Sequence, residues 1–545
     1  MRWFVIINVE WQKKAIFEGL LKGVFMDKYA EQALREYNSE ETAAHLGGVD
    51  NRPFWNVYST QFTFVPAFHF PRILLAKGYL FTAEDKDGVK HTFTADWPTA
   101  SLAPIWAELP VGVVHLTVES LDENGKPKHI AGARSFYKCT PFPGRDAYPP
   151  KARSYRESAL AAYRYVYNDE AVQYWLHHGK PMPDYAHNVY PAKTIDAVVR
   201  AMVAYAKLEP TCAETALKLA CRAADYLLSI SFGAGHPLEG LPPTYSFENL
   251  NAEAVNKVAP AAQNCVGTTM MIYPVSAGIA YLTLADATGE EKYFNAALRI
   301  AEYYKKNLLP CGSWYLLYDC ATGKPLSENI CLDFKFVNFF QMLYQKTKDE
   351  TWHNLEVAHY KYITDKCLKE YKWEGQFEDT PVSLPYANLT HFHPNNLIDY
   401  ITRTFAGDEK MVAVAVDLMR FVEDQFVVWG EHPAWNINWA SDIWHYPAGL
   451  EQYYCYAPID SSTTTIFLAF MNMYKLTGDR LYMEKAMTLA DMITRVQNPE
   501  TGIVPTFFMG ENCAYGYENF WINCLLYTAN GMMKIAEFVE ENGLE

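Results

Sequence analysis

Carboxyl groups and aromatic rings gather in the stretch KWEGQFEDTPVSLPYANLTHFHPNN, residues 372–396. This stretch contains the adjacent pair Glu378 and Asp379, and a second aromatic-rich stretch, LEQYYCYAPID, contains Glu451. Glycoside hydrolysis requires one carboxylic acid to protonate the leaving oxygen and one carboxylate to act as a nucleophile or to activate water. Because aromatic neighbours can desolvate a carboxyl group and raise its pKa, we predict Glu378, Asp379 and Glu451 as catalytic residues.

Each of these carboxyl groups also has a purely structural interpretation. Glu378 and Asp379 could cap a helix or bind backbone amides in a tight loop, and Glu451 could form an ordinary salt bridge. Two further acids, Glu423 and Asp424, end a predicted helix, where a carboxylate opposes the helix dipole. We expect these two to be solvated or ion-paired rather than catalytic.

Side chains suited to holding a sugar accompany the predicted acids. A pyranose stacks on aromatic faces, and its hydroxyls bind amides and other polar groups. The predicted substrate-binding residues are His391, His393, Asn396, Trp435, Trp439, Gln452, Tyr453 and Trp521. The two histidines lack a third ligand at a recognisable metal-binding spacing, so we predict neither a metal nor another cofactor.

The composition indicates a large globular protein with a negative charge. Of the 545 residues, 50% are apolar and 15% aromatic, and the length exceeds the roughly 250 to 300 residues at which one core stops growing. The net charge of −16 argues against nucleic acid and anionic membrane surfaces as partners. No apolar run reaches the roughly 18 residues of a membrane-spanning helix. Homo-oligomer formation stays open.

The cysteines and the start of the sequence bear on the cellular compartment. The 11 cysteines show no CxxC pairing, which is typical of reduced and mostly buried thiols. The opening MRWFVIINVEWQKK has no small-residue cleavage site. We therefore expect a cytoplasmic protein, or a periplasmic one if the start is truncated or mis-assigned.

The first part of the chain changes from helical to β patterning. Residues 1–50 are predicted to form a helical lead-in, and residues 51–140 alternate apolar and polar positions between turn sequences such as DKDG and DENG. That pattern predicts a β-sandwich. The runs ILLAKGYLFTAED, LPVGVVHLTVESLDENG and FYK resemble the fibronectin type III-like modules of bacterial polysaccharide-processing proteins. A proline-rich stretch, CTPFPGRDAYPPKA, follows as the boundary.

Residues 150–545 show apolar positions at helical spacing almost throughout. The segments LADATGEEKYFNAALRIAEYY and YKLTGDRLYMEKAMTLADMI share one pattern of a helix, a turn of Thr, Gly and an acid, and a second helix. Short turns make antiparallel neighbours. They alternate with long connections at 232–263, 309–329, 368–388, 428–458 and 498–516. Because neighbouring helices alternate in direction, the long connections should emerge on one face and contain the functional residues.

Six helical hairpins in series resemble the (α/α)6 toroid of six-hairpin glycosidases, uronate lyases and sugar epimerases. The fold class expected is therefore a multidomain α and β protein, with a fibronectin type III-like β-sandwich followed by an (α/α)6 toroid. The phrases KWEGQFEDTPV, RFVEDQFVVW, LEQYYCYAPIDSS and FWINC are similar to glycoside hydrolase family 154. That resemblance implies a β-glucuronidase-like activity.

Three functions remain open at this point. The first is a glycoside hydrolase that releases a terminal uronic acid from a glycan by paired carboxylates. The second is a uronate polysaccharide lyase or sugar epimerase on the same toroid, with His393 and a tyrosine moving protons. The third is a glycan-binding protein without catalytic activity.

Overall fold

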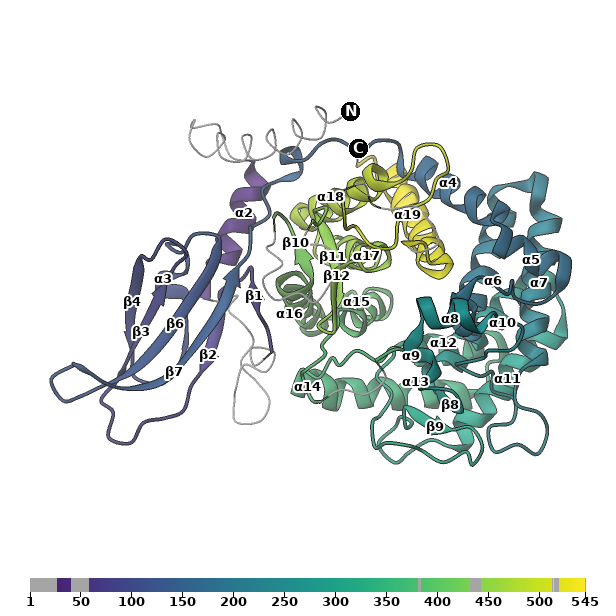
Figure 1. The fold of residues 1–545 in the computed structure, drawn as a ribbon, viewed down its shortest axis with the longest axis horizontal. Coiled ribbons are helices and arrows are strands. Elements are labelled where there is room, and N and C mark those ends of the chain that lie inside the picture. The colour runs from purple at the N-terminus through teal and green to yellow at the C-terminus, as the bar shows by residue number, and fades with distance from the viewer. Residues whose placement is uncertain are drawn as a thin grey trace.

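The computed structural model describes residues 27–40, 58–380, 384–431, 443–511, 513 and 519–544. A β domain lies on one side of the molecule and a ring of helices on the other (Figure 1). The predicted helical lead-in is described only from Asp27 to Glu40, where α2 (Lys28–Tyr37) packs against the helical ring. Within the described ranges, no helix combines the length and apolarity that crossing a bilayer requires.

The β domain contains one five-stranded sheet in the order β1-β7-β6-β3-β4 and a two-stranded ribbon of β2 and β5. β1 pairs with β7 in parallel, and the other pairs of the sheet are antiparallel. The strands and the short helix α3 have the bounds β1 (Gln61–Phe62), β2 (Ala67–His69), β3 (Tyr79–Glu84), β4 (Lys90–Ala95), β5 (Thr99–Ser101), α3 (Ala103–Trp106), β6 (Gly112–Leu121) and β7 (Pro127–Lys138).

The predicted fibronectin type III-like sandwich is not confirmed, because the sheet curls into a half-barrel (Figure 1). β6 and β7 form a long hairpin with two register shifts, and such bulges bend strands and increase their twist. Phe62, Phe68 and Phe136 pack on the covered side. The first part of β7 and alternate residues of β4 are exposed. The alternating pattern therefore predicted the strands correctly, but among the described residues the sheet that packs on the five-stranded one is only the two-stranded ribbon of β2 and β5.

The helical domain consists of antiparallel helix pairs, as the alternation of short and long connections predicts. Among the described residues, six pairs pack as hairpins, namely α6 with α7, α10 with α11, α12 with α13, α15 with α16, α17 with α18, and α19 with α4. Their bounds are α4 (Tyr155–Asn168), α6 (Pro191–Leu208), α7 (Ala213–Ser229), α10 (Ile272–Thr288), α11 (Glu291–Lys306), α12 (Lys335–Thr347), α13 (Glu350–Tyr362), α15 (Phe392–Thr404), α16 (Glu409–Phe426), α17 (Asp460–Thr477), α18 (Arg480–Val496) and α19 (Ile522–Asn542).

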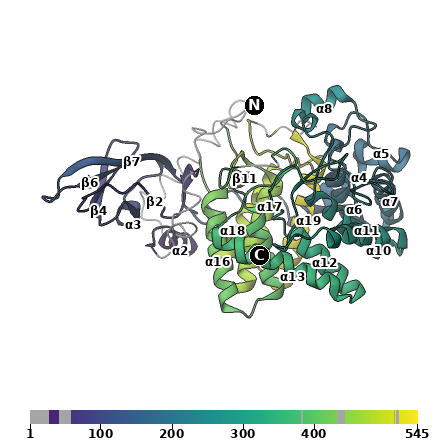
Figure 2. The same cartoon turned by 90° about the horizontal axis from the view of Figure 1, so that it is seen from below.

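The last helix closes the ring. α19 packs between α17 and α6, and its hairpin partner α4 comes from the start of the domain. The inner helices α6, α10, α12, α15, α17 and α19 each begin after a long connection. Their amino-terminal ends therefore point to the same face of the ring. In Figure 2, α8 (Ala252–Val258) and β11 (Ala448–Gln452), both from long connections, appear at that end of the ring.

A small sheet fixes the long connection that contains Glu451. β10 (Val427–Val428) continues directly from α16, and β11 pairs with both β10 and β12 (Cys455–Pro458). Gly449 of β11 approaches α17 so closely that a Cβ would lie 2.8 Å from the backbone of Thr463. Close backbone approach of this kind requires glycine, so β11 is seated directly on the start of α17.

The β domain docks on the carboxyl-terminal end of α16. Glu423 accepts hydrogen bonds from the Tyr37 hydroxyl at 2.5 Å and the Trp429 indole at 3.0 Å, and it forms an ion pair with Lys485 at 2.8 Å. The Lys485 side chain is fully buried. Glu423 is thus ion-paired, as expected from the sequence, and it joins α2 to the helical domain.

The neighbouring Asp424 binds the first strand region of the β domain. One of its oxygens accepts both the Thr63 and the Phe64 backbone N–H at 2.7 Å. Burial raises the pKa of Asp424 to about 7, although these hydrogen bonds lower it in part. A carboxylate at the end of α16 interacts unfavourably with the helix dipole. At both acids, specific partners offset this effect.

We predict that Lys485→Met will destabilise the protein by about 3–5 kcal/mol, because it leaves the buried Glu423 carboxylate without its cation. Denaturant unfolding checks the value. The matched control is Lys292→Met, which removes a half-exposed partner of Asp225 and should cost no more than about 1 kcal/mol. Equal effects of the two substitutions would contradict a stabilising role for the buried pair.

Candidate active site

The candidate site lies where the connection after α14 (Leu368–Glu370), strand β11 and the starts of α6, α10 and α19 meet. Glu378 is the best-connected acid of this region, with a side chain that is 3% exposed. Its Oε1 accepts from the Lys193 ammonium and its Oε2 from the Tyr273 hydroxyl. Tyr245 also donates to the Glu378 carbonyl oxygen at 2.5 Å. Each oxygen of this carboxylate therefore has a strong donor.

The charge of Glu378 is retained despite its burial. Burial alone would raise the pKa of Glu378, but the Lys193 charge and the hydrogen bonds from Lys193 and Tyr273 outweigh it and lower the pKa. Glu378 in turn raises the pKa of Lys193 against the opposing effect of burial. The two groups therefore form a permanent ion pair. The Lys193 side chain is 24% exposed.

Asp379 and Glu451 are the acids of this site that reach solvent. Asp379 is exposed and Glu451 is half-buried. Desolvation by the surrounding protein, followed by the charge of Glu378, raises the pKa of Asp379 to about 6. Desolvation and then the charge of Asp379 raise the pKa of Glu451 to about 7. The structure thus brings together all three predicted catalytic residues, with the pKa of Glu378 lowered by Lys193 and the pKa values of Asp379 and Glu451 raised, first by desolvation and then by neighbouring charge.

A tight loop positions Glu378 and Asp379. Gly375 lies against the β11 residue Gln452, and a Cβ there would be 2.5 Å from the Gln452 side-chain oxygen. That oxygen accepts from the Asn388 amide at 2.8 Å and from the Thr380 hydroxyl at 3.3 Å. Gln452 therefore connects the two acid-bearing connections, and a side chain at position 375 would displace the Gln452 amide.

Trp521 is the predicted aromatic residue that the structure places in this site. Its ring is half-buried, with the Lys193 ammonium 5.2 Å from the ring centroid. The ring of His187 lies against it, with 4.4 Å between centroids. The Trp521 backbone N–H donates to the Thr506 hydroxyl at 3.0 Å, which fixes the residue just before α19 begins.

The other predicted substrate-binding residues have different surroundings. His391 and His393 are buried at the start of α15, where His391 contacts the Asn395 amide at 2.9 Å and His393 donates to the Glu374 carbonyl at 3.0 Å. Burial lowers the pKa of both. Asn396 is half-buried on the same turn.

Tyr453 follows Gln452 but contacts the β domain. Its hydroxyl lies 2.9 Å from the Ser59 hydroxyl and donates to the Gln425 side-chain oxygen at 2.7 Å. The ring stacks on Phe426. The predicted residues Trp435 and Trp439 lie outside the described residues.

Sequence reasoning missed the partners of the acids. Lys193 lies in the first turn of α6, where a cation opposes the helix dipole. That unfavourable position is the feature of the sequence that could have identified Lys193 as the partner of a buried acid. Tyr273, Tyr245 and His187 gave no comparable signal, because tyrosine and histidine are common in helix starts and loops.

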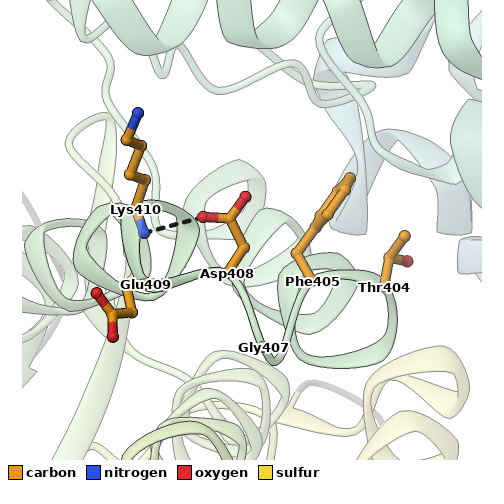
Figure 3. A pocket seen from close by; sticks show the side chains of 6 residues that line it. All are labelled: Thr404, Phe405, Gly407, Asp408, Glu409 and Lys410. Atoms are coloured by element: carbon orange, nitrogen blue, oxygen red, sulfur yellow. Dashed lines mark hydrogen bonds between the residues drawn. The ribbon is translucent and has the colours of Figure 1, made fainter.

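A surface hollow lies at a distance from these acids. It has a volume of about 670 Å³ and is lined by Thr404, Phe405, Gly407, Asp408, Glu409 and Lys410 (Figure 3). It occupies the turn at the far end of α15, whose 13 residues span roughly 20 Å. Asp408 caps α16 there by accepting the Lys410 N–H at 2.9 Å. This hollow is therefore a helix-capping turn.

Within the described ranges, no group of three or more His, Cys, Asp or Glu side chains is arranged to hold a metal ion. The Glu378 carboxylate is bonded to Lys193 and Tyr273 instead.

No family model matches the sequence, and no curated protein matches it significantly, so the family 154 assignment is not supported. The structure is similar to a family 76 glycoside hydrolase from a bovine Bacteroides thetaiotaomicron strain, with a TM-score of 0.44, 9% identity, and 86% of this chain and 94% of that chain covered. It is also similar to cellobiose 2-epimerase from Spirochaeta thermophila, with a TM-score of 0.49, 12% identity and coverages of 71% and 98%. A polysaccharide lyase aligns with a TM-score of 0.42, 10% identity and coverages of 71% and 99%. These similarities are too distant to decide the chemistry.

We predict that Lys193→Met will destabilise the protein by about 3–5 kcal/mol at neutral pH, because it leaves the buried Glu378 charge unpaired. The pKa of Glu378 is lowered in the folded state, so the stabilisation is present above the ordinary glutamate pKa and is lost as pH falls through the folded value. The stability difference between the variant and the natural protein should therefore shrink on acidification. Denaturant unfolding at several pH values measures it.

The double variant Lys193→Met with Glu378→Gln is the control. It removes both charges, so it should recover much of the stability that the single lysine variant loses. A double variant that is no more stable than Lys193→Met would contradict the ion-pair explanation.

Proposed function

We propose that this chain is a glycoside hydrolase that releases a terminal uronic acid from a glycan. The observation that supports it best is the group of Asp379 and Glu451, two solvent-reaching carboxyls with separated and raised pKa values, beside the Lys193 cation. Glycosidases use such a pair, with one member protonated and the other ionised. The aromatic ring of Trp521 lies beside Lys193 and adds an apolar group to the site.

The pKa values assign the two roles. Asp379, with a pKa of about 6, loses its proton before Glu451, with a pKa of about 7. Between these values Asp379 is ionised and Glu451 protonated. Glu451 then protonates the leaving glycosidic oxygen as general acid, and Asp379 either attacks the anomeric carbon or activates water.

Glu378 acts as a positioning residue in this proposal. Both of its oxygens are already bonded, and its side chain is nearly inaccessible. Its charge holds Lys193 in place and raises the pKa of Asp379. This role differs from the direct catalytic one expected from the sequence alone.

Lys193 supports the choice of a uronic acid. Its side chain is 24% exposed, and it lies in the first turn of one of the inner helices whose amino-terminal ends share this face. A cation and positive helix ends favour a ligand carboxylate. The substrate carboxylate would bind Lys193 in competition with water, while Glu378 remains its permanent partner.

Elimination or epimerisation is the second candidate, because Lys193 could neutralise a uronate carboxyl and a nearby tyrosine could move a proton. Burial and the Glu378 charge raise the pKa of Tyr273, which disfavours its acting as a base. His393, the proton carrier expected from the sequence, is buried and donates to a carbonyl. Hydrolysis is therefore preferred.

Product analysis separates the candidates. On a uronate-containing glycan, release of a reducing sugar without an unsaturated product supports hydrolysis. An ultraviolet-absorbing unsaturated uronate identifies a lyase, and a change of sugar configuration identifies an epimerase. Binding without any product identifies a glycan-binding protein.

We predict that Asp379→Asn and Glu451→Gln will each lower turnover at least about 100-fold, the lower range for losing a general acid or base. Steady-state kinetics on a cleaved glycoside and thermal unfolding give turnover and folding separately. Glu409→Gln, an exposed acid lining the hollow at the far end of α15, is the matched control and should retain full turnover. Natural turnover in both site variants would remove these acids from the mechanism.

The pH profile gives an independent prediction. As pH rises through about 7, Glu451 loses the proton it must donate, and kcat/KM falls. As pH falls through about 6, Asp379 becomes protonated, and kcat/KM falls again. The profile should be a narrow bell with its maximum between these values. A flat profile from pH 5 to 8 would be inconsistent with the assigned roles.

A further inference from the structure

The tip of the hairpin that contains Glu451 is held from both domains. Tyr453 directly follows β11 at this tip. Its hydroxyl donates to the Gln425 side-chain oxygen at 2.7 Å and lies 2.9 Å from the Ser59 hydroxyl. Gln425 is in the last turn of α16, and Ser59 precedes β1 of the β domain. One hydroxyl group therefore joins the hairpin, the helical ring and the β domain.

The hydrogen bonds at the Tyr453 hydroxyl have a fixed direction. Gln425 is fully buried, and its amide nitrogen donates to the Asp424 carboxylate at 2.7 Å and to the Gln61 carbonyl at 3.2 Å. Because both of these partners are acceptors, the amide oxygen of Gln425 faces Tyr453. Tyr453 gives its single hydroxyl proton to that oxygen, and Ser59 therefore donates to Tyr453.

The groups around Tyr453 are themselves held in place. Ser59 is 3% exposed, and its carbonyl accepts from the Arg134 guanidinium of β7 at 2.5 Å. The same guanidinium lies 4.7 Å from the centroid of the Phe68 ring. The Tyr453 ring stacks on Phe426, with 5.6 Å between centroids. Displacing the hairpin tip therefore requires the domain interface to open as well.

Glu451 depends on this hairpin for its environment, because it lies only two residues before Tyr453. The base of the hairpin is fixed separately, since the Gly449 N–H donates to the Thr463 hydroxyl of α17 at 2.9 Å. The Glu451 carbonyl accepts from the Thr390 hydroxyl at 2.9 Å. Desolvation is the largest cause of the raised pKa of Glu451, about 7. The titratable and charged groups that act on Glu451 or are acted on by it are Asp379, Glu378, Lys193, Cys455, Asp460 and Cys524.

We propose that Tyr453 is a positioning residue for Glu451, and that the β domain acts on the active site through the contact of Ser59 with Tyr453. This role replaces the substrate binding expected for Tyr453 from the sequence. The assignment rests on the proposed function for the role of Glu451. The coupling of Ser59 and Tyr453 to the hairpin rests on the hydrogen bonds alone, so it can be tested without any substrate.

The test uses the full chain with Tyr453→Phe, Ser59→Ala, both changes together, or the matched control Tyr293→Phe. Tyr293 is a fully buried tyrosine of α11 whose hydroxyl donates to Asp225 at 3.0 Å. Each tyrosine substitution removes one hydroxyl and keeps the ring. Hydrogen exchange followed by mass spectrometry reports the opening of residues 448–458. The pH profile of kcat/KM reports the ionisation of Glu451.

Tyr453→Phe and Ser59→Ala should each speed amide exchange in residues 448–458 by about 2- to 10-fold, the effect of losing one net hydrogen bond on local opening. Because a looser hairpin admits water to Glu451, the high-pH limb of the profile should move to lower pH while the low-pH limb stays. The double variant should show less than the product of the single effects, since both changes remove the same contact.

The control Tyr293→Phe should speed exchange within residues 291–306 and leave residues 448–458 and the pH profile unchanged. Unchanged exchange of residues 448–458 in Tyr453→Phe would overturn the proposal. So would a raised KM with an unmoved high-pH limb, which means that Tyr453 contacts the substrate, or fully multiplicative effects in the double variant. If exchange rises as expected while Glu451→Gln keeps full turnover, the coupling stands and the hydrolase mechanism fails.

Discussion

The ion pair of Lys193 and Glu378 is the interaction on which the candidate site depends. Burial would otherwise neutralise the glutamate, and the helix dipole opposes a lysine in the first turn of α6. Each group stabilises the charge of the other. One consequence is a cation held beside the acids of the site. Another is a fixed negative charge that adds to desolvation in raising the pKa of Asp379, as the charge of Asp379 adds to desolvation in raising the pKa of Glu451.

The ring architecture makes this arrangement possible. Since each inner helix begins after a long connection, residues distant in sequence meet at one face. Lys193 begins α6, Tyr273 begins α10, and Trp521 directly precedes α19. Their partners Glu378 and Glu451 come from the intervening connections. A site built from several helix starts can bring together carboxylates, a cation and an aromatic ring without requiring any one segment to supply them all.

The β domain is connected to the same region through α16. Glu423 and Asp424 bind Tyr37 and the backbone of Thr63 and Phe64 at the end of this helix. The chain then continues into β10, which pairs with the strand that contains Glu451. Tyr453, two residues beyond Glu451, contacts Ser59. Docking of the β domain therefore stabilises the hairpin that positions the proposed general acid. The domain interface thus contributes to the site as well as to stability.

The sequence by itself determined the helix pairs, the face that collects the long connections, and the acids at 378, 379 and 451, because helical periodicity, turn residues and carboxyl-rich loops are local signals. Tertiary structure alone decided the curl of the β sheet, the engagement of Tyr453 with Ser59 instead of the acids, and the pairing of Glu378 with Lys193. These features depend on contacts between residues far apart in the chain. The same holds for the division of roles among the acids, since a pKa is set by burial and neighbouring charge, which exist only once the ring has closed.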